Sequence, residues 1–276
     1  MNASYVAIAG LCVLLAGVFF YRVYLALRSG KRGYEVGTCK TIGNREIQMD
    51  YFAVEKNDHG LLAVLADGMG KDAGGRIAAK TVVRVFVELF GEYNMLDNPS
   101  YFFRKAFLTA NREILKQLDD ERGKAVASTL MIRDGKLYYA IVGNVKIAVY
   151  RNGELIELGA GHTVNVLAEN KYYEGVLKRE DAVAMLQEKR IYNYLGRDGF
   201  GKIGFYDEPV GLKENDIVVL MSDGTYEAIG WKNMEDYLAQ KKKCKKIALD
   251  MIEHINQKTE DRDNASVVLI KIGEQT

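Results

Sequence analysis

The sequence predicts an α+β domain preceded by a membrane-spanning helix. Hydrophobic residues make up 48% of the 276 residues and charged residues 27%, which is typical of a globular chain. Turn dipeptides separate short apolar runs in the middle of the chain, and two segments before them carry apolar side chains at helical spacing. Residues 5–21, in contrast, contain no charged side chain.

The overall composition excludes several classes of site. A net charge of +1 gives no general reason to expect a nucleic-acid partner. The cysteines Cys12, Cys39 and Cys244 show no C-x-x-C spacing, which suits a reducing compartment and argues against a disulfide framework or a structural zinc site. The three histidines form no H-x-x-x-H pair. Any metal site is therefore expected to use carboxylates, which favour Mg²⁺ or Mn²⁺.

The N-terminal segment has the features of an anchor. Residues 4–27 are long enough to cross a bilayer core of roughly 30 Å. The basic residues lie at its C-terminal end and beyond: Arg22 within the segment, then Arg28, Lys31 and Arg32 after it. By the positive-inside rule we expect a single-pass protein of the cell membrane with its remaining chain in the cytoplasm. The alternative is a buried core helix. The predicted domains are an anchor with its basic flank at 1–32 and a second domain at 33–276.

The first part of that second domain is expected to alternate between strands and helices. After a short linker at 31–37, strands are predicted at 51–54 and 60–66, joined by a polar turn. Helices of about 76–90 and 100–118 then carry apolar residues on one face.

An antiparallel meander is expected next. Its strands are predicted at 128–132, 136–142, 146–150 and 154–157. Asp134-Gly135 and Asn152-Gly153 lie between paired runs, and such dipeptides are strong hairpin signals.

The last third combines an irregular segment with a final strand. Residues 159–211 are predicted to leave the sheet as loops with a helix at 180–189, either for recognition or as a solvated surface. Further elements are expected at 216–221 (strand), 226–228, 233–239 and 245–254 (helices) and 265–272 (strand).

One stretch suggests an anion at the end of a sheet. The apolar run 61–66 ends at Asp67, and four glycines follow within eight residues, at positions 68, 70, 74 and 75. The Asp67 carboxylate can bind a hard cation, and glycine lets the backbone approach so that the Gly68 carbonyl could be a second ligand. Asp-Gly is also ordinary turn chemistry.

Three more carboxylates occupy comparable positions. Asp223 closes the apolar strand 216–221, Asp263 opens the last strand, and Asp50 opens the strand 51–54. If these strands are neighbours, their acidic ends meet and repel one another unless cations neutralise them. Two divalent ions about 4 Å apart, bridged by Asp67, would do so and would activate a water. The alternative is that each Asp caps a helix or starts a turn, which is our interpretation of Asp72, Asp119, Asp120, Asp134 and Asp261.

A cation that could grip phosphate precedes one of these carboxylates. Arg45 lies five residues before Asp50, and an extended segment would bring its guanidinium to the same place. The alternative for Arg45 is an ordinary surface residue.

With these residues in place, the chain resembles the metal-dependent type 2C serine/threonine protein phosphatases, in their bacterial branch, over about residues 35–272. The resemblance rests on combined motifs: Arg45-x-x-x-x-Asp50, Asp67-Gly68-Met69-Gly70 with Gly74-Gly75, Ala127-Ser128-Thr129-Leu130, Ser222-Asp223-Gly224 and Asp263-Asn264. It implies a four-layer α/β/β/α sandwich of two antiparallel sheets with helices outside.

The resemblance also implies a centre of two Mn²⁺ or Mg²⁺ ions. Asp67 would bridge the metals, the Gly68 carbonyl would bind one, and Asp223 and Asp263 the other. Asp50 would act through a metal-bound water and Arg45 would hold the phosphate.

The chain departs from the family pattern at several positions. Gly143-Asn144 stands where the family has glycine-aspartate, so a ligand often used for a third metal is missing, and Glu227 replaces a frequent aspartate. A third ion is therefore not expected. Met69 stands where eukaryotic members carry a proposed catalytic histidine, and His162 is interpreted as structural.

The predicted function is hydrolysis of phosphoserine and phosphothreonine in cytoplasmic proteins, opposite a serine/threonine kinase. One alternative is a phosphatase of the sporulation and stress branch that acts on anti-sigma-factor antagonists. The other is a phosphatase fold of poor activity used as a sensor or scaffold.

Overall fold

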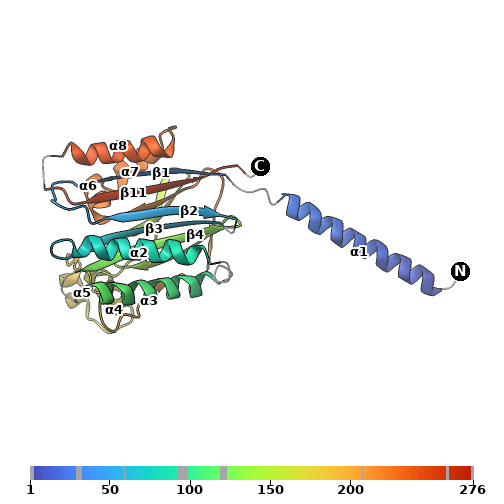
Figure 1. Ribbon diagram of the computed structural model, residues 1–276, viewed down its shortest axis with the longest axis horizontal. Coiled ribbons are helices and arrows are strands. Elements are labelled where there is room, and N and C mark those ends of the chain that lie inside the picture. The colour runs from blue at the N-terminus through green and yellow to red at the C-terminus, as the bar shows by residue number, and fades with distance from the viewer. Residues whose placement is uncertain are drawn as a thin grey trace.

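Two antiparallel sheets packed face to face, with helices on both outer sides, form the body of the protein in a computed structural model (Figure 1). The structure describes residues 3–28, 33–58, 60–92, 98–118, 123–206, 208–258 and 261–274, and within 3–28 it describes side chains only for 10–22.

The first sheet has five strands among the described residues, in the order β1-β11-β10-β6-β7. They are β1 (Tyr34–Thr41), β6 (Lys146–Arg151), β7 (Glu154–Leu158), β10 (Ile217–Met221) and β11 (Ala265–Ile272). The central strands β10 and β11 are buried along nearly their whole length. Both of their faces are covered, which explains why their sequences are continuous apolar runs.

The second sheet has six strands in the described part of the chain, in the order β2-β3-β4-β5-β8, with β9 also paired to β5. They are β2 (Tyr51–Asn57), β3 (Gly60–Met69), β4 (Lys124–Arg133), β5 (Lys136–Val142), β8 (Gly204–Phe205) and β9 (Val210–Gly211). The two predicted hairpin turns are confirmed. Asp134 and Asn152 have φ of 51° and 53°, and the glycine after each is also positive, as a tight two-residue hairpin requires.

Three apolar layers hold the sandwich together. Between the sheets, Leu65 and Leu130 pack in one cluster with Val268 and Ile270, all fully buried. Aromatic side chains such as Phe86 fill the layer between the second sheet and its helices. Met251 belongs to the corresponding layer on the first sheet. The four-layer α/β/β/α arrangement implied by the sequence is therefore confirmed.

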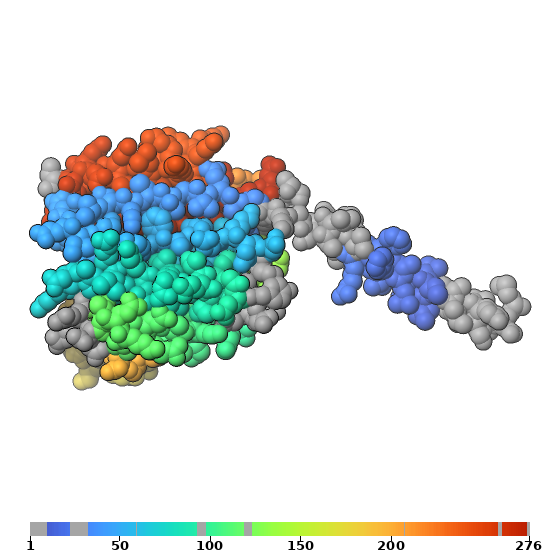
Figure 2. Space-filling view, viewed as in Figure 1, coloured from blue at the N-terminus to red at the C-terminus, as the bar shows by residue number. Residues whose placement is uncertain are grey.

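The helices form the two outer layers. The second sheet is covered by α2 (Gly74–Phe90) with α3 (Pro99–Gln117), and the first by α6 (Asp223–Ile229), α7 (Trp231–Leu238) and α8 (Cys244–Asn256). Figure 2 shows these layers in close contact on one face, from the red C-terminal helix through the blue strands to the green α3. Residues 159–211 contribute α4 (Val164–Tyr173) and α5 (Arg179–Met185).

Two local predictions differ from the structure. Residues 34–37, expected in a linker, belong to the edge strand β1, which pairs with β11 from Tyr34↔Ile272 to Thr41↔Ala265. Edge position leaves most of its side chains at least partly exposed, so no alternating pattern marks it. The helix α4 was not predicted because its apolar residues do not repeat at helical spacing, and only Val164 and Ala168 are buried.

The prediction of a membrane anchor is wrong. Residues 4–27 lie within a helix, α1 (Ala3–Arg28). However, none of the helices in the described chain combines the length and the apolar character needed to cross a membrane. The predicted location, a single-pass protein of the cell membrane with its remaining chain in the cytoplasm, is therefore wrong as well. Lys31 and Arg32 lie outside the described residues.

Candidate metal centre

A cavity of about 530 Å³ opens where β3, β10 and β11 bring their ends together. Asp67, Asp223 and Asp263 all line it, as do Gly68 and Arg45. We call it the metal-centre cavity. The three carboxylates, up to 196 positions apart in the sequence, are thus brought to one place, as the strand-end argument predicted. Asp50, the remaining predicted residue, is fully buried and does not line the cavity.

Asp67 lies inside β3 rather than after it. The strand continues to Met69, and β4 pairs with it through Asp67↔Val126 and Gly68↔Ala125. A side chain at Gly68 is impossible here, because a Cβ would lie 2.1 Å from the carbonyl oxygen of Gly75 at the start of α2. Glycine therefore lets the end of β3 and the first turn of α2 touch, which fixes Asp67 at the cavity wall.

Asp50 is held from the opposite sheet. Ser222 Oγ donates a hydrogen bond of 2.8 Å to Asp50 Oδ2 and accepts one of 2.9 Å from the Ser266 amide. The other oxygen, Asp50 Oδ1, is buried and has no hydrogen-bond partner among the described residues. A buried carboxylate oxygen without a partner is costly, so it indicates a missing water or cation.

The carboxyl groups strongly perturb one another. Burial raises the pKa of Asp50 to about 6, and the charges of Asp223 and Asp263 add to this effect. Burial also raises the pKa of Asp67 well above its ordinary value, with further contributions from Asp50, Asp223 and Asp263. The pKa of Asp223 is raised mainly by burial as well. Without a cation, the site disfavours its own ionised form.

Asp223 is oriented by two hydrogen bonds. Asn144 Nδ2 donates to Asp223 Oδ2 at 3.0 Å, and the Gly224 amide donates to Oδ1 at 2.7 Å. Asn144 therefore positions a carboxylate rather than supplying one. The turn that carries Asn144 is held in place by His162, because the Gly143 amide donates a hydrogen bond of 3.0 Å to His162 Nδ1. His162 is buried and does not line the metal-centre cavity, in agreement with a structural role.

Asp263 is engaged by Arg45. The guanidinium donates from Nε to Oδ1 at 3.0 Å and from Nη2 to Oδ2 at 3.1 Å, and it also lies 3.4 Å from Asp261. Both side chains of the Arg45–Asp263 pair are about half exposed. The predicted phosphate ligand and a predicted metal ligand thus bind each other in this structure.

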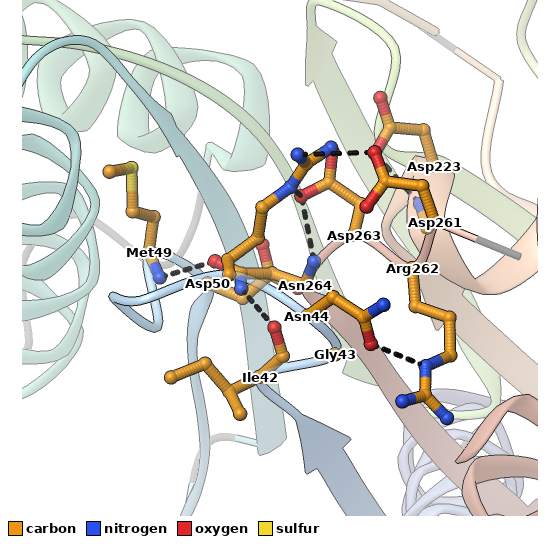
Figure 3. Close-up of polar contacts among 12 residues, drawn as sticks. Ile42, Gly43, Asn44, Met49, Asp50, Asp223, Asp261, Arg262, Asp263 and Asn264 are labelled. Carbon is orange, nitrogen blue, oxygen red and sulfur yellow. Dashed lines mark hydrogen bonds and ion pairs between the residues drawn. The ribbon is translucent and has the colours of Figure 1, made fainter.

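The loop that carries Arg45 is fastened to the start of β11 (Figure 3). The buried amide of Asn264 accepts from the Met49 N–H at 2.6 Å and donates to the Ile42 carbonyl at 2.8 Å. Gly43 has φ of 63°, and a Cβ there would lie 2.4 Å from the Asp263 carbonyl oxygen. These contacts bring Arg45 to Asp263 across 218 positions of sequence.

The described residues contain no group of three or more acidic, histidine or cysteine side chains already placed to hold a metal ion. Arg45 donates to both oxygens of Asp263, while Asn144 and the Gly224 amide donate to those of Asp223. The residues nevertheless fit a hard divalent cation in kind. Their donors are carboxylates and a backbone carbonyl, burial and the neighbouring carboxylates raise the pKa of Asp67, and Asp50 has an oxygen without a partner among the described residues.

Sequence reasoning missed three residues of this site. Ser222, Asn144 and Asn264 were noticed within motifs but received no role, because their partners lie 79 to 215 positions away. Asp72, interpreted as a turn residue, has the positive φ of 52° that suits a turn and also lines the cavity. Asp119 and Asp120 lie outside the described residues.

Known proteins resemble this chain over most of its length. The sequence profile of the family described as protein phosphatase 2C matches residues 40–265. The serine/threonine phosphatase Stp of Listeria welshimeri is 24% identical over 79% of this chain and 86% of its own. The protein phosphatase PhpP of Streptococcus pneumoniae is 25% identical over 78% of this chain and 87% of its own.

Solved structures agree with these relatives. The serine/threonine phosphatase of S. agalactiae superposes with a TM-score of 0.75 at 26% identity, over 87% of this chain and all of that one. The catalytic domain of the phosphatase PstP, solved with two manganese ions, has a TM-score of 0.66 at 18% identity, over 87% and 99% of the two chains. The second likeness shows the fold alone. Taken with the family match over residues 40–265, these likenesses show that the chain belongs to the protein phosphatase 2C family and is a serine/threonine protein phosphatase of that type.

Proposed function

We propose that residues 33–276 form one phosphatase domain that removes phosphate from phosphoserine and phosphothreonine in proteins, using two Mn²⁺ or Mg²⁺ ions. The observation that carries this proposal is that Asp67, Asp223 and Asp263 line one cavity at the ends of three strands. The manganese ions of PstP support the choice of metal.

The ligands follow from the donors at the cavity. Asp67, the Gly68 carbonyl, Asp223 and Asp263 would hold the ions, with Asp67 shared between them and Asp50 reaching them through water. When bound, the ions would neutralise the carboxylates and supply an activated water. Asn144 offers an amide in place of a third ligand carboxylate and already donates to Asp223, so we propose two ions rather than three.

Arg45 and Asp50 would serve the reacting groups. A guanidinium that grips a carboxylate with two parallel hydrogen bonds can grip phosphate oxygens in the same way. We therefore propose that Arg45 exchanges Asp263 for the phosphate of the substrate. The unpartnered oxygen of Asp50 would accept a hydrogen bond from the attacking water and orient it.

The substrates would be phosphorylated proteins whose phosphate is added by a serine/threonine kinase. Relatives named as serine/threonine phosphatases support this class. The sporulation and stress branch, acting on anti-sigma-factor antagonists, is the more specific alternative within the same chemistry.

The test is hydrolysis of a phosphothreonine peptide by the full chain, after removal of metal and with Mn²⁺ restored. We expect turnover that depends on Mn²⁺ and is lost in Asp67→Ala. Asp181→Ala is a matched control, since this aspartate is exposed on α5 and does not line the metal-centre cavity. Wild-type turnover no higher than that of Asp67→Ala, despite bound Mn²⁺, would instead support the sensor or scaffold alternative.

A further inference from the structure

A second cavity, of about 610 Å³, adjoins the metal-centre cavity. The two share Asp223 and Ile191 in their linings. We call the second one the flanking cavity. Its walls come partly from the segment 159–166 and from Lys189-Arg190, and partly from α6. A peptide whose phosphate lies at the metal centre has this cavity beside it, and the volume is within the range of pockets that hold a ligand.

The charged side chains of the flanking cavity are mostly paired with one another. Lys146 Nζ lies 2.6 Å from Glu157 Oε1, and Lys189 Nζ lies 2.8 Å from Glu227 Oε1. Asp223 belongs to the metal centre as well. Arg190 is different: in the described part of the chain no ion pair or hydrogen bond engages its guanidinium. After these pairs cancel, Arg190 and Asp223 remain, and because Asp223 also belongs to the metal-centre cavity, Arg190 is the cation that the flanking cavity offers to a ligand.

The backbone that carries Arg190 is fixed. Its carbonyl accepts a hydrogen bond of 2.9 Å from the Val164 amide, and its amide donates to Glu188 Oε1 at 3.3 Å. The next residue forms a β-bridge, Thr163↔Ile191. The side chain itself is exposed. A rigid backbone thus presents an uncommitted cation one residue from the wall that both cavities share.

We propose, building on the proposed function, that Arg190 is a specificity-determining residue. It selects phosphoproteins that carry an acidic side chain, Asp or Glu, a few positions from the phosphorylated residue. An extended peptide advances about 3.3 Å per residue, so a neighbouring side chain reaches the flanking cavity while the phosphate stays at the metal centre. A carboxylate there would pair with the guanidinium through charge-assisted hydrogen bonds.

The experiment uses the full chain with Mn²⁺ and a set of phosphothreonine peptides. The reference peptide has Gln at every position flanking the phosphothreonine, and each other peptide has one Gln replaced by Glu, moved one position at a time along both sides. We expect kcat/KM to rise about fivefold for at least one Glu position at low salt, the scale of an exposed ion pair, and this gain to shrink as salt is added.

Variants identify the residue responsible. Arg190→Ala should abolish the gain while leaving kcat/KM for the all-Gln peptide unchanged. Arg190→Glu should reverse the preference, so that Lys at the same position becomes the better substrate. Arg179→Ala is the matched control, because Arg179 is exposed on α5 and lines neither cavity, and it should keep the gain.

The outcomes separate this inference from the proposed function. If the wild type hydrolyses the all-Gln peptide but no Glu position raises kcat/KM, or if the gain survives in Arg190→Ala, the specificity role is wrong and the phosphatase assignment stands. If no peptide is hydrolysed with Mn²⁺, both are overturned.

Discussion

The metal-centre cavity and the flanking cavity share a wall but are built in different ways. The first takes its carboxylates from the ends of strands whose apolar residues are fully buried, so the backbone of Asp67 and Asp223 is held by the core of both sheets. The second is bounded by the segment 159–211, in which α5 buries only Ala182. On the functions proposed above, the buried strands would carry the chemistry and the exposed segment would set substrate choice, where substitutions are tolerated.

The largest expected effect is a loss of kcat/KM when Asp223 is substituted, compared with the same substitution at Glu227, four residues later. Asp223 lines both cavities, whereas Glu227 lines only the flanking one. Asp223→Asn should lower Mn²⁺-dependent kcat/KM about 10³-fold, because a metal ligand and its charge are lost. Glu227→Gln, the same change of carboxylate to amide, should alter it less than about fivefold. Equal losses of kcat/KM in the two variants would contradict the proposal that the metal-centre cavity carries the chemistry and the flanking cavity does not.

A pH-dependent stability effect concerns the junction between the two regions. Burial lowers the pKa of His162 from 6.5 to about 4, with the charge of Lys202 contributing, and its Nδ1 accepts from the Gly143 amide. As the pH falls, His162 therefore takes up a proton near pH 6.5 in the unfolded chain but only near pH 4 in the folded chain. Stability from this group is present above pH 6.5 and is lost as the pH falls toward 4, by up to about 3 kcal/mol.

His162→Gln should flatten this dependence. Its free energy of unfolding in urea should fall less between pH 7 and pH 4.5 than that of the wild type, whatever its absolute value. His254→Gln is a control, because the partly exposed His254 lies on α8, away from this junction. Parallel curves for wild type and His162→Gln would contradict the buried, neutral state of His162.

The smallest of these effects tests the exchange of partners at Arg45. Because Arg45 occupies Asp263 in this structure, a metal ion must displace it. Arg45→Ala should raise KM for a phosphopeptide about tenfold, while the affinity for Mn²⁺, measured by calorimetry, should stay the same or increase. Arg84→Ala, which removes a paired arginine that lines neither cavity, should change neither quantity. A loss of Mn²⁺ affinity in Arg45→Ala would show that Arg45 supports the metal site rather than competing for it.

The sequence predicted those parts of the molecule whose signal is local. The turn dipeptides Asp134-Gly135 and Asn152-Gly153 need positive φ, and the structure has it. The helices α2 and α3 were found because their apolar faces repeat at helical spacing, whereas α4 has no such repeat and was missed. The predicted anchor is not supported, because no helix in the described part of the chain is both long and apolar enough to cross a membrane.

In the candidate site, too, only residues with a local sequence signal could be predicted. The gathering of Asp67, Asp223 and Asp263 could be predicted because each lies within or close to one end of a strand, and such ends meet when the strands are neighbours. The roles of Asn264 and Asn144 could not, because they depend on hydrogen bonds to residues far away in the sequence. The ion pair between Arg45 and Asp263 was also beyond prediction, since each residue had been assigned a different ligand.

Anomalous scattering from crystals of the full chain soaked in Mn²⁺ would locate the metal ions. We expect manganese in the metal-centre cavity, within ligand distance of Asp67, Asp223 and Asp263, with Arg45 released from Asp263. Manganese bound elsewhere, or none in this cavity at a concentration that supports hydrolysis, would contradict this expectation.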